Sequence, residues 1–225
     1  MIYVTGDTHG LININKLIVA CKCNKINEND YIIIAGDFGC VWDMESLSRN
    51  ISAYELFPCK ILFVDGNHEN FDVLSQYPED NWCGGRIHRI SKKIIHLMRG
   101  QIFSLDGITI LTIGGADSSD KEYRTPSVSW WSAEAISKAD IKEAKFNLSK
   151  YNYTVDYIIS HTCAETNITK DLLNLRTDRI IGNSEILLNE IETCCMYKKW
   201  LFGHWHTDMK LNDRVQGIYN NVVKL

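Results

Sequence analysis

The 225-residue sequence has the composition of an ordinary globular protein, with 45% hydrophobic and 23% charged residues. A chain of this length can bury a substantial core without disulfides or a structural metal, so a bound metal would serve chemistry rather than folding. The formal net charge of -4 provides no basic face for phosphate backbones, so sequence-independent nucleic-acid binding is not expected.

The first third of the chain predicts strands that alternate with helices. Short apolar runs predict buried strands and the segments between them predict helices, in the order strand 2–5, helix about 11–23, strand 31–35, helix about 43–56 and strand 61–65. Such an order implies parallel strands joined by right-handed crossovers.

The middle of the chain predicts antiparallel pairing. Three short apolar runs follow one another at 94–97, 101–105 and 108–113. The last two are separated by Asp106-Gly107, and Asp-Gly is a strong hairpin signal. We therefore expect a second group of strands that differs from the parallel opening.

Two helices and a closing set of strands are predicted beyond this point. Ser137 begins one helix, with Asp140 as a weak capping box, and Ser184 begins another. The last segments, at 209–213, 215–219 and 221–225, have the pattern of an antiparallel meander. Together these elements indicate an α/β protein with two sheets, flanked by helices, in a single domain over residues 1–225.

Side chains that commonly bind metals follow the apolar runs at five places. Four runs end in glycine and a polar residue and the fifth in serine and histidine, at Gly6-Asp7, Gly36-Asp37, Gly66-Asn67, Gly203-His204 and Ser160-His161. Ligands gather beyond the carboxyl ends of strands in open α/β sheets, so we expect these side chains to meet. Because residues i and i+2 of an extended segment point the same way, Asp7 with His9, and His204 with His206, are each expected to bind one ion together.

The candidate ligands comprise two carboxylates, one amide and four imidazoles: Asp7, His9, Asp37, Asn67, His161, His204 and His206. This set exceeds what one ion with open positions would use, and a bridging Asp37 would divide it into two sets of four. A single such histidine is usually structural, but most of the 7 histidines follow apolar runs. Oxygen and nitrogen ligands without thiolate suit Mn²⁺, Fe or Zn²⁺. Two such ions about 3.5–4 Å apart would form a clamp for displacement at phosphorus.

These motifs, in this order, resemble those of the calcineurin-like metallophosphoesterase superfamily. The matching blocks are Asp7-x-His9, Gly36-Asp37, Gly66-Asn67-His68-Glu69, His161 and Gly203-His204-x-His206. The resemblance covers residues 5–206 and implies a four-layer α/β/β/α sandwich of two mixed sheets. It also implies two divalent metal ions at the strand ends, with Mn expected and Fe, Zn or Ni as alternatives.

Matched by position, the resemblance implies a role for each residue. One metal would be held by Asp7, His9, Asp37 and His206, and the other by Asp37, Asn67, His161 and His204. A hydroxide that bridges the metals would attack phosphorus, and His68 would protonate the leaving alkoxide as general acid. The expected activity is that of a phosphatase or phosphodiesterase on a small phosphate ester.

The second block departs from that of the Ser/Thr protein phosphatases, Gly-Asp-x-x-Asp-Arg-Gly. Cys40 and Val41 stand where those enzymes have the aspartate partner of the catalytic histidine and a phosphate-binding arginine. We therefore expect a different substrate and a different phosphate contact, for which Arg124 is the candidate; the alternative is a solvated or salt-bridged arginine. Trp130 and Trp131 are candidates for stacking on a nucleobase or aryl group, with core packing as the alternative.

Two other functions fit the same fold. One is a nuclease of the superfamily, which the acidic charge disfavours, and the other is a metal-binding scaffold without catalytic activity. The sequence begins without a basic leader and has no apolar stretch near the ~20 residues that span a bilayer, so a cytoplasmic protein without a membrane partner is expected. The 8 cysteines are expected to be reduced thiols. The oligomeric state is not predicted.

Overall fold

In the computed structural model, the first of two sheets carries the parallel opening. Its strand order is β13-β1-β2-β3-β6-β5-β4. The strands are β1 (Ile2–Thr5), β2 (Tyr31–Ala35), β3 (Lys60–Val64), β4 (Glu79–Trp82), β5 (Gly85–Arg89), β6 (Ile94–Leu97) and β13 (Val223–Lys224). The four strands β1, β2, β3 and β6 are parallel, and antiparallel strands extend the sheet at both edges. The structure describes residues 1–225 except the side chain of Met44.

The second sheet has the strand order β11-β12-β10-β9-β8-β7. Its strands are β7 (Gln101–Leu105), β8 (Ile108–Ile113), β9 (Thr154–Ser160), β10 (Met196–Phe202), β11 (Met209–Lys210) and β12 (Val215–Gly217). The hairpin β7–β8 and the edge pair β11–β12 are antiparallel, and β8, β9, β10 and β12 are parallel. Both sheets are therefore mixed.

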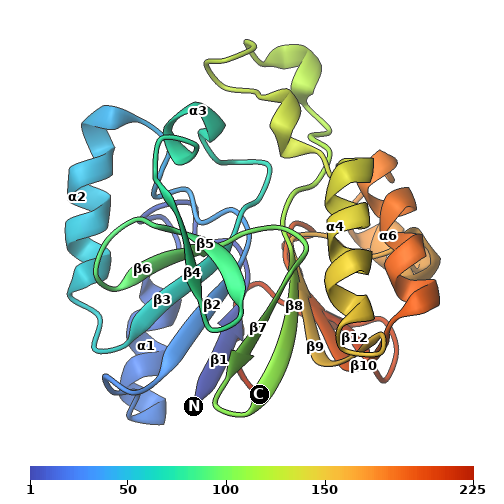
Figure 1. Cartoon of the computed structure of the whole chain (residues 1–225). Helices are drawn as coiled ribbons and strands as arrows, with labels where there is room; N and C mark the ends of the chain where they lie inside the picture. Colours follow the sequence, from blue (N-terminus) through green and yellow to red (C-terminus); the bar gives the residue numbers. More distant parts are fainter.

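The two sheets face each other, and helices cover their outer faces (Figure 1). The helices are α1 (Asn15–Asn24), α2 (Met44–Glu55), α3 (Phe71–Leu74), α4 (Lys138–Ser149), α5 (Lys170–Leu175) and α6 (Asn183–Cys194). Helices α1 and α2 lie on the first sheet, and α4 and α6 lie on the second. This arrangement is the four-layer α/β/β/α sandwich expected from the sequence.

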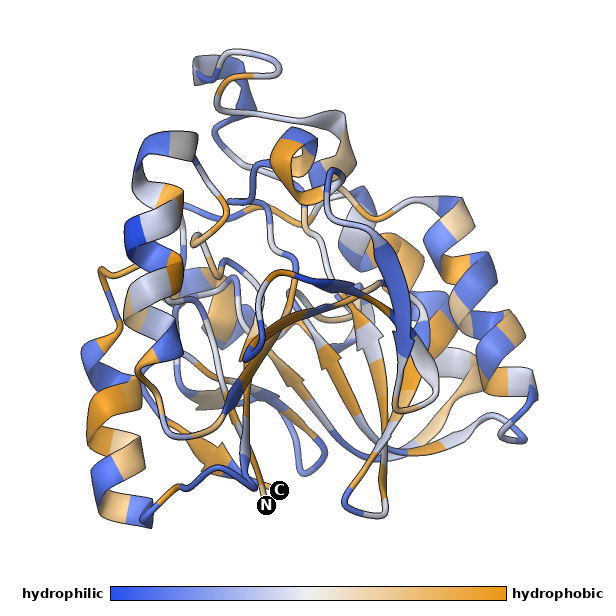
Figure 2. Cartoon of the chain, turned by 60° about the vertical axis from the view of Figure 1, so that its left-hand side comes forward, coloured by the Kyte–Doolittle hydropathy of each residue, from blue (hydrophilic) through white to orange (hydrophobic). Residues whose placement is uncertain are grey.

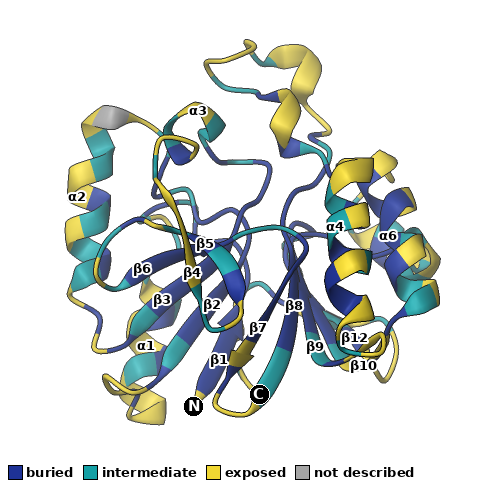
Figure 3. Cartoon of the chain, viewed as in Figure 1, coloured by how far each residue is buried: buried dark blue, intermediate teal, exposed yellow. Residues whose placement is uncertain are grey.

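Alternation along the strands explains the layers. In β2, Ile32 and Ile34 belong to the core shared with α1 and α2, whereas Ile33 and Ala35 belong to the core between the sheets. Strand β10 behaves in the same way, with Trp200 facing the outer helices and Leu201 facing the other sheet. Because both faces are covered, the strands are continuous apolar runs, which are orange in Figure 2 and dark blue in Figure 3.

The predicted elements are confirmed in most of the chain. Ser137 caps α4 and forms the expected capping box with Asp140, and Asp43 caps α2 through a hydrogen bond from the amide of Ser46. The first helix begins later than predicted, at Asn15, because residues 10–14 form turns. The sequence pattern does not predict the two strands at 79–82 and 85–89, because their side chains are mostly polar; β4 is the edge strand of the sheet and β5 lies next to it.

Two predicted pairings are wrong. The run at 94–97 does not join the hairpin that follows it, because β6 pairs in parallel with β3 in the other sheet. The last three segments form only part of the predicted meander: β11 and β12 pair antiparallel as expected, but β12 also pairs in parallel with β10, and β13 crosses to pair with β1. In the part of the chain that the structure describes, no helix is long and apolar enough to cross a membrane.

Candidate metal centre

The seven candidate ligands lie at the carboxyl ends of five strands from both sheets. Strand β1 leads to Asp7 and His9, β2 to Asp37 and β3 to Asn67 in the first sheet; in the second, β9 leads to His161 and β10 to His204 and His206. A segment of residues 117–136 projects above this edge in Figure 1. The facing sheets thus bring together side chains that are almost 200 positions apart in the sequence.

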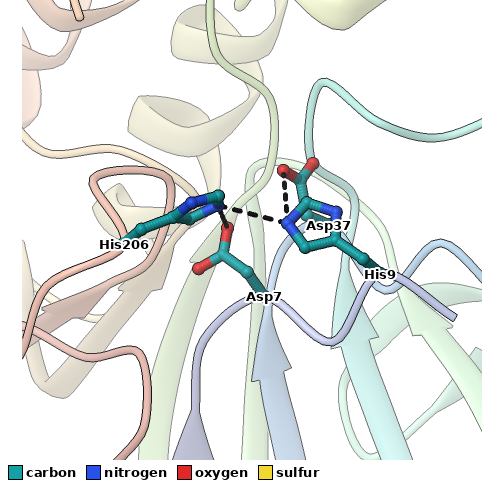
Figure 4. Close-up of side chains that lie close together, drawn as sticks. All are labelled: Asp7, His9, Asp37 and His206. Carbon is teal, nitrogen blue, oxygen red and sulfur yellow. Dashed lines mark hydrogen bonds and ion pairs between the residues drawn. The ribbon is translucent and has the colours of Figure 1, made fainter. Parts of the chain in front are cut away.

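Four of the ligands form what we call the outer half of the site: Asp7, His9, Asp37 and His206. One ligand atom of each lies within 4.8 Å of the others. The Nε2 atoms of His9 and His206 are 3.1 Å apart, and His206 Nε2 lies 3.6 Å from Asp7 Oδ1 (Figure 4). The two imidazoles remain partly accessible, with side chains 20% and 24% exposed.

The inner half consists of Asp37, Asn67, His161 and His204, all of which are buried. Nε2 of His161 and Nδ1 of His204 lie 3.0 and 2.9 Å from Oδ1 of Asn67. His161 Nε2 also lies 3.3 Å from Asp37 Oδ1. Asp37 therefore borders both halves.

Hydrogen bonds orient the inner ligands. The Nδ1 atom of His161 lies 2.9 Å from the carbonyl oxygen of Ala35, which makes it the donor and leaves Nε2 facing the site, where it would offer a lone pair once a bound cation displaces its proton. The amide nitrogen of Asn67 donates to Ser118 Oγ over 3.0 Å, so its oxygen faces the two histidines. The ligand atoms of His161, His204 and Asn67 thus face one another.

These residues fit divalent cations. Oδ2 of Asp7 and Oδ2 of Asp37 are buried, and no described group lies within hydrogen-bond distance of either atom. A buried carboxylate oxygen without a partner costs several kcal/mol unless a cation or hydrogen-bond donor compensates it. The mixed carboxylate, amide and imidazole donors suit first-row divalent metals. The outer half could hold one ion and the inner half a second.

The charges within the site reinforce this interpretation. Burial alone would raise the pKa of Asp37, but His161 and His68 lower it well below its usual range. Burial likewise opposes protonation of His161, yet Asp37 and Asp7 raise the pKa of that imidazole to about 9. Asp37 is therefore held ionised inside the protein, where it attracts positive charge.

The glycines before the ligands prevent steric overlap. A Cβ atom at Gly36 would lie 2.0 Å from His161 Nδ1, and Gly36 also has a φ of +85°. A Cβ atom at Gly66 would lie 2.1 Å from Asp37 Oδ1. Glycine therefore allows the ligand of one strand to pack directly against the backbone of the next.

The predicted i, i+2 pairing of ligands is wrong for His204 and His206. Both have a left-handed backbone, with φ of 60° and 45°, so the segment is not extended. His204 consequently points toward Asn67 and the inner half, whereas His206 points toward His9 and the outer half. His9 and Asp37 also have positive φ, which indicates backbone strain concentrated at this site.

His68 and Arg124 lie together beside the outer half. The His68 ring centroid is 5.4 Å from that of His9, and Arg124 Nη2 donates to His68 Nε2 over 2.9 Å. The Arg124 side chain also forms an ion pair with Asp120 and is only 10% exposed. Burial and, to a smaller extent, Arg124 lower the pKa of His68 to about 4, although Asp37 opposes the shift.

The two tryptophans near Arg124 have different environments. Trp131 is buried, and its indole nitrogen donates to Asp72 Oδ2 over 2.8 Å, so core packing accounts for it. Trp130 is half-buried and lines a cavity with Pro126 on the projecting segment. Arg99, another arginine near the site, forms an ion pair with the buried carboxylate of Asp65.

Several residues that support the ligands are not predictable from the motifs. Tyr219 stacks on His206 with ring centroids 4.6 Å apart, and Lys16 donates to the carbonyl oxygens of Gly6 and Asp7. Glu69 accepts hydrogen bonds from the amides of Phe38 and Gly39, next to Asp37. Only Glu69 carried a sequence signal, because it belongs to the Gly66-Asn67-His68-Glu69 block.

Comparison with known proteins agrees with this geometry. The family model described as calcineurin-like phosphoesterase matches residues 1–208. The chain belongs to this family. It is therefore a hydrolase of the metallophosphoesterase type, and the family uses divalent metal ions.

Among solved structures, the chain is similar to the phosphopantetheinyl hydrolase PptH from Mycobacterium tuberculosis. The two sequences are 14% identical, and the alignment covers 97% of this chain and 87% of that one, with a TM-score of 0.42. None of the curated proteins compared with the sequence matches it.

Proposed function

We propose that this member of the family hydrolyses a small phosphomonoester or phosphodiester at two divalent metal ions. The observation that carries the proposal is the pair of buried carboxylates of Asp7 and Asp37, each of which has one unpartnered oxygen and lies in a cluster of imidazoles. Asp7, His9, Asp37 and His206 would hold one ion, and Asp37, Asn67, His161 and His204 the other. When bound, such ions lower the pKa of a water nucleophile toward neutrality and neutralise the phosphoryl oxygens.

His68 is assigned the role of general acid toward the leaving oxygen. Its position beside His9 places it above the outer half, on the side that is partly open to solvent. Without substrate, the hydrogen bond from Arg124 favours a neutral His68. A phosphate group that draws Arg124 away would remove this cation and add negative charge, and both changes favour a protonated imidazole.

Arg124 is assigned to the phosphate group. It reaches the site from the projecting segment and is held by Asp120 on one side and His68 on the other. A guanidinium can form two parallel hydrogen bonds with phosphate oxygens, which would orient the ester toward the outer half. This contact would replace the arginine that the second motif block lacks.

The test is metal-dependent hydrolysis of 4-nitrophenyl phosphate and bis(4-nitrophenyl) phosphate. The protein is depleted of metal and then reconstituted separately with Mn²⁺, Fe²⁺, Zn²⁺ or Ni²⁺, and bound metal is counted alongside activity. We expect two ions per chain and release of nitrophenol from at least one ester, with Mn²⁺ the most effective ion. Two bound metals without hydrolysis of either ester would contradict the proposal and favour a scaffold.

A further inference from the structure

A cavity of about 550 Å³ opens beside the outer half of the metal centre. His9 and His68 line it, and the other walls come from the segment after β1, the segment after β2 and the first turns of α2. The volume falls within the range of sites that enclose small organic ligands. Because His68 belongs to both the proposed reaction centre and the cavity, a leaving group protonated by His68 would lie in this space.

Trp42 forms the aromatic wall of the cavity. Its ring centroid is 6.2 Å from that of His68, with an angle of 39° between the planes. Leu11 and Ile12 also line the cavity, and Ile12 is 78% exposed, so an apolar surface next to the site is left uncovered by the protein. The first turns of α2 and the residue before it add polar side chains to the lining, namely Asp43, Ser46, Arg49 and Asn50. The Trp42 face favours a flat ring, and the polar residues allow that ring to carry polar groups, as a nucleobase does.

Several contacts hold the Trp42 ring in place before any ligand binds. Trp131 packs against it edge to face, with centroids 5.7 Å apart and planes at 83°. Trp131 is itself anchored by the hydrogen bond to Asp72, and the carbonyl oxygen of Trp42 accepts a hydrogen bond from the Asn70 side chain over 2.8 Å. A ring fixed in this way loses little entropy when it stacks on a ligand.

We propose that Trp42 selects phosphate esters whose leaving group carries a planar aromatic ring, such as a nucleoside or an aryl alcohol. The proposal rests on the proposed function, since it assigns a substrate class to the same site. The ring would stack on Trp42 while the ester oxygen lies near His68. The stacking role thus moves from Trp130 and Trp131, the candidates from the sequence, to a tryptophan that lines the cavity of the site.

The test uses two matched pairs of substrates. Benzyl phosphate and cyclohexylmethyl phosphate have leaving alcohols of similar size and acidity but differ in planarity. Adenosine 5′-monophosphate and ribose 5-phosphate lose the same primary alcohol with and without a base. In the metal-reconstituted wild-type protein, we expect kcat/KM to be about 5–20-fold higher for the planar member of at least one pair, as one stacking contact would provide. A preference in the first pair alone would identify an aryl alcohol, and one in the second pair would identify a nucleoside.

The variants decide whether Trp42 is responsible. Trp42→Leu keeps an apolar side chain but removes the aromatic face, so the ratio within the preferred pair should fall to about 1, whereas Trp42→Phe should keep most of it. Trp130→Leu is the matched control, because Trp130 is half-buried and lines a different cavity. Metal content and unfolding temperature are measured for each variant. Calorimetric binding of benzylphosphonate and cyclohexylmethylphosphonate, which are not hydrolysed, provides a second readout.

The outcomes separate the two proposals. If the metal-loaded protein hydrolyses neither pair and neither nitrophenyl ester, the proposed phosphoesterase function fails. If it hydrolyses only the nitrophenyl esters, the function stands and the proposed class of leaving group is overturned. If all four esters are hydrolysed with ratios near 1, or if the ratio falls in Trp130→Leu and not in Trp42→Leu, the function stands and the role of Trp42 is overturned.

Discussion

The two halves of the metal centre share Asp37 but differ in how the protein builds them. In the inner half, hydrogen bonds with Ala35 and Ser118 fix His161 and Asn67, and every ligand is buried. In the outer half, His9 and His206 are partly exposed, contact aromatic rings, and lie within hydrogen-bond distance of each other. The cavity, His68 and Arg124 all border the outer half.

This difference indicates different roles for the two ions. A buried site with oriented ligands favours tight retention of an ion, because little must be reorganised on binding. A partly open site can expose an ion and its water to substrate. We therefore expect the inner ion to be held more tightly and the outer ion to be the one nearer the substrate.

The largest effect is expected from Asp37→Ala, which removes the carboxylate common to both halves. Activity should fall by at least ~10³-fold, because several kcal/mol of metal-dependent stabilisation would be lost. Metal counting by atomic spectroscopy should show loss from both halves. Asp213→Ala, on an exposed loop, is the control, and a variant that still bound two ions would show that Asp37 is not shared.

The next largest effect is expected from His68→Ala. Turnover should fall by ~10²–10⁴-fold, the usual contribution of a general acid, while both metals remain bound. Phosphate release from benzyl phosphate, whose leaving alkoxide needs a proton, and metal analysis of the same sample measure the two quantities together. With 4-nitrophenyl phosphate the loss should be smaller, because nitrophenolate leaves without a proton. His88→Ala, a half-buried histidine stacked on His96 away from the site, should change neither. Loss of metal from the His68 variant would instead make His68 a ligand.

The strands and the positions of the ligands could be predicted because they depend on local patterns. Burial on both faces makes a run such as 31–35 apolar throughout, and the polar residue at its end marks where the strand leaves the core. This pattern identifies Asp37 and His161 as candidate ligands from the sequence. Their assignment to two halves came from the family resemblance, not from the pattern.

The rest depends on contacts between segments far apart in the chain. Tyr219 reaches His206 only because the last strands cross between the sheets, and Trp42 lines the cavity because Trp131, 89 positions later, supports it. The opposite directions of His204 and His206 follow from left-handed backbone angles, which non-glycine residues seldom adopt. None of these features has a periodic sequence signal.

A smaller effect, confined to the outer half, is expected from Tyr219→Leu. Without the stacked ring, His206 would be less well oriented, and affinity for the weaker of the two ions should fall about 10-fold, at the low end of losses for groups that support ligands. Calorimetric titration of the metal-free variant with metal should show a weaker affinity in one binding phase and an unchanged affinity in the other. Tyr123→Leu is the control, since that ring is 92% exposed. Equal weakening of both phases would remove the distinction between the halves.

The smallest effect is expected from Glu134, which supports the inner half of the site. Glu134 accepts a hydrogen bond from Ser118, and Ser118 accepts one from Asn67. Burial raises the pKa of Glu134 from 4.5 to about 7. The folded protein therefore keeps a proton that the unfolded chain releases between these values, so the free energy of unfolding should fall as pH rises from about 4.5 to 7.

Glu134→Gln should remove this dependence, and denaturant unfolding at pH 5 and pH 8 measures it. We expect the pH-dependent loss to shrink by roughly 1–2 kcal/mol, below the ~3 kcal/mol of a full shift because the carboxyl can relax on ionising. Glu143→Gln is a control of opposite sign, since hydrogen bonds from Gln101 and Asn147 help lower the pKa of Glu143. An unchanged pH dependence in the Glu134 variant would mean that the pKa of this carboxyl is not raised. Ser118, the partner of Asn67 in the inner half, would then bind a charged rather than a neutral carboxyl.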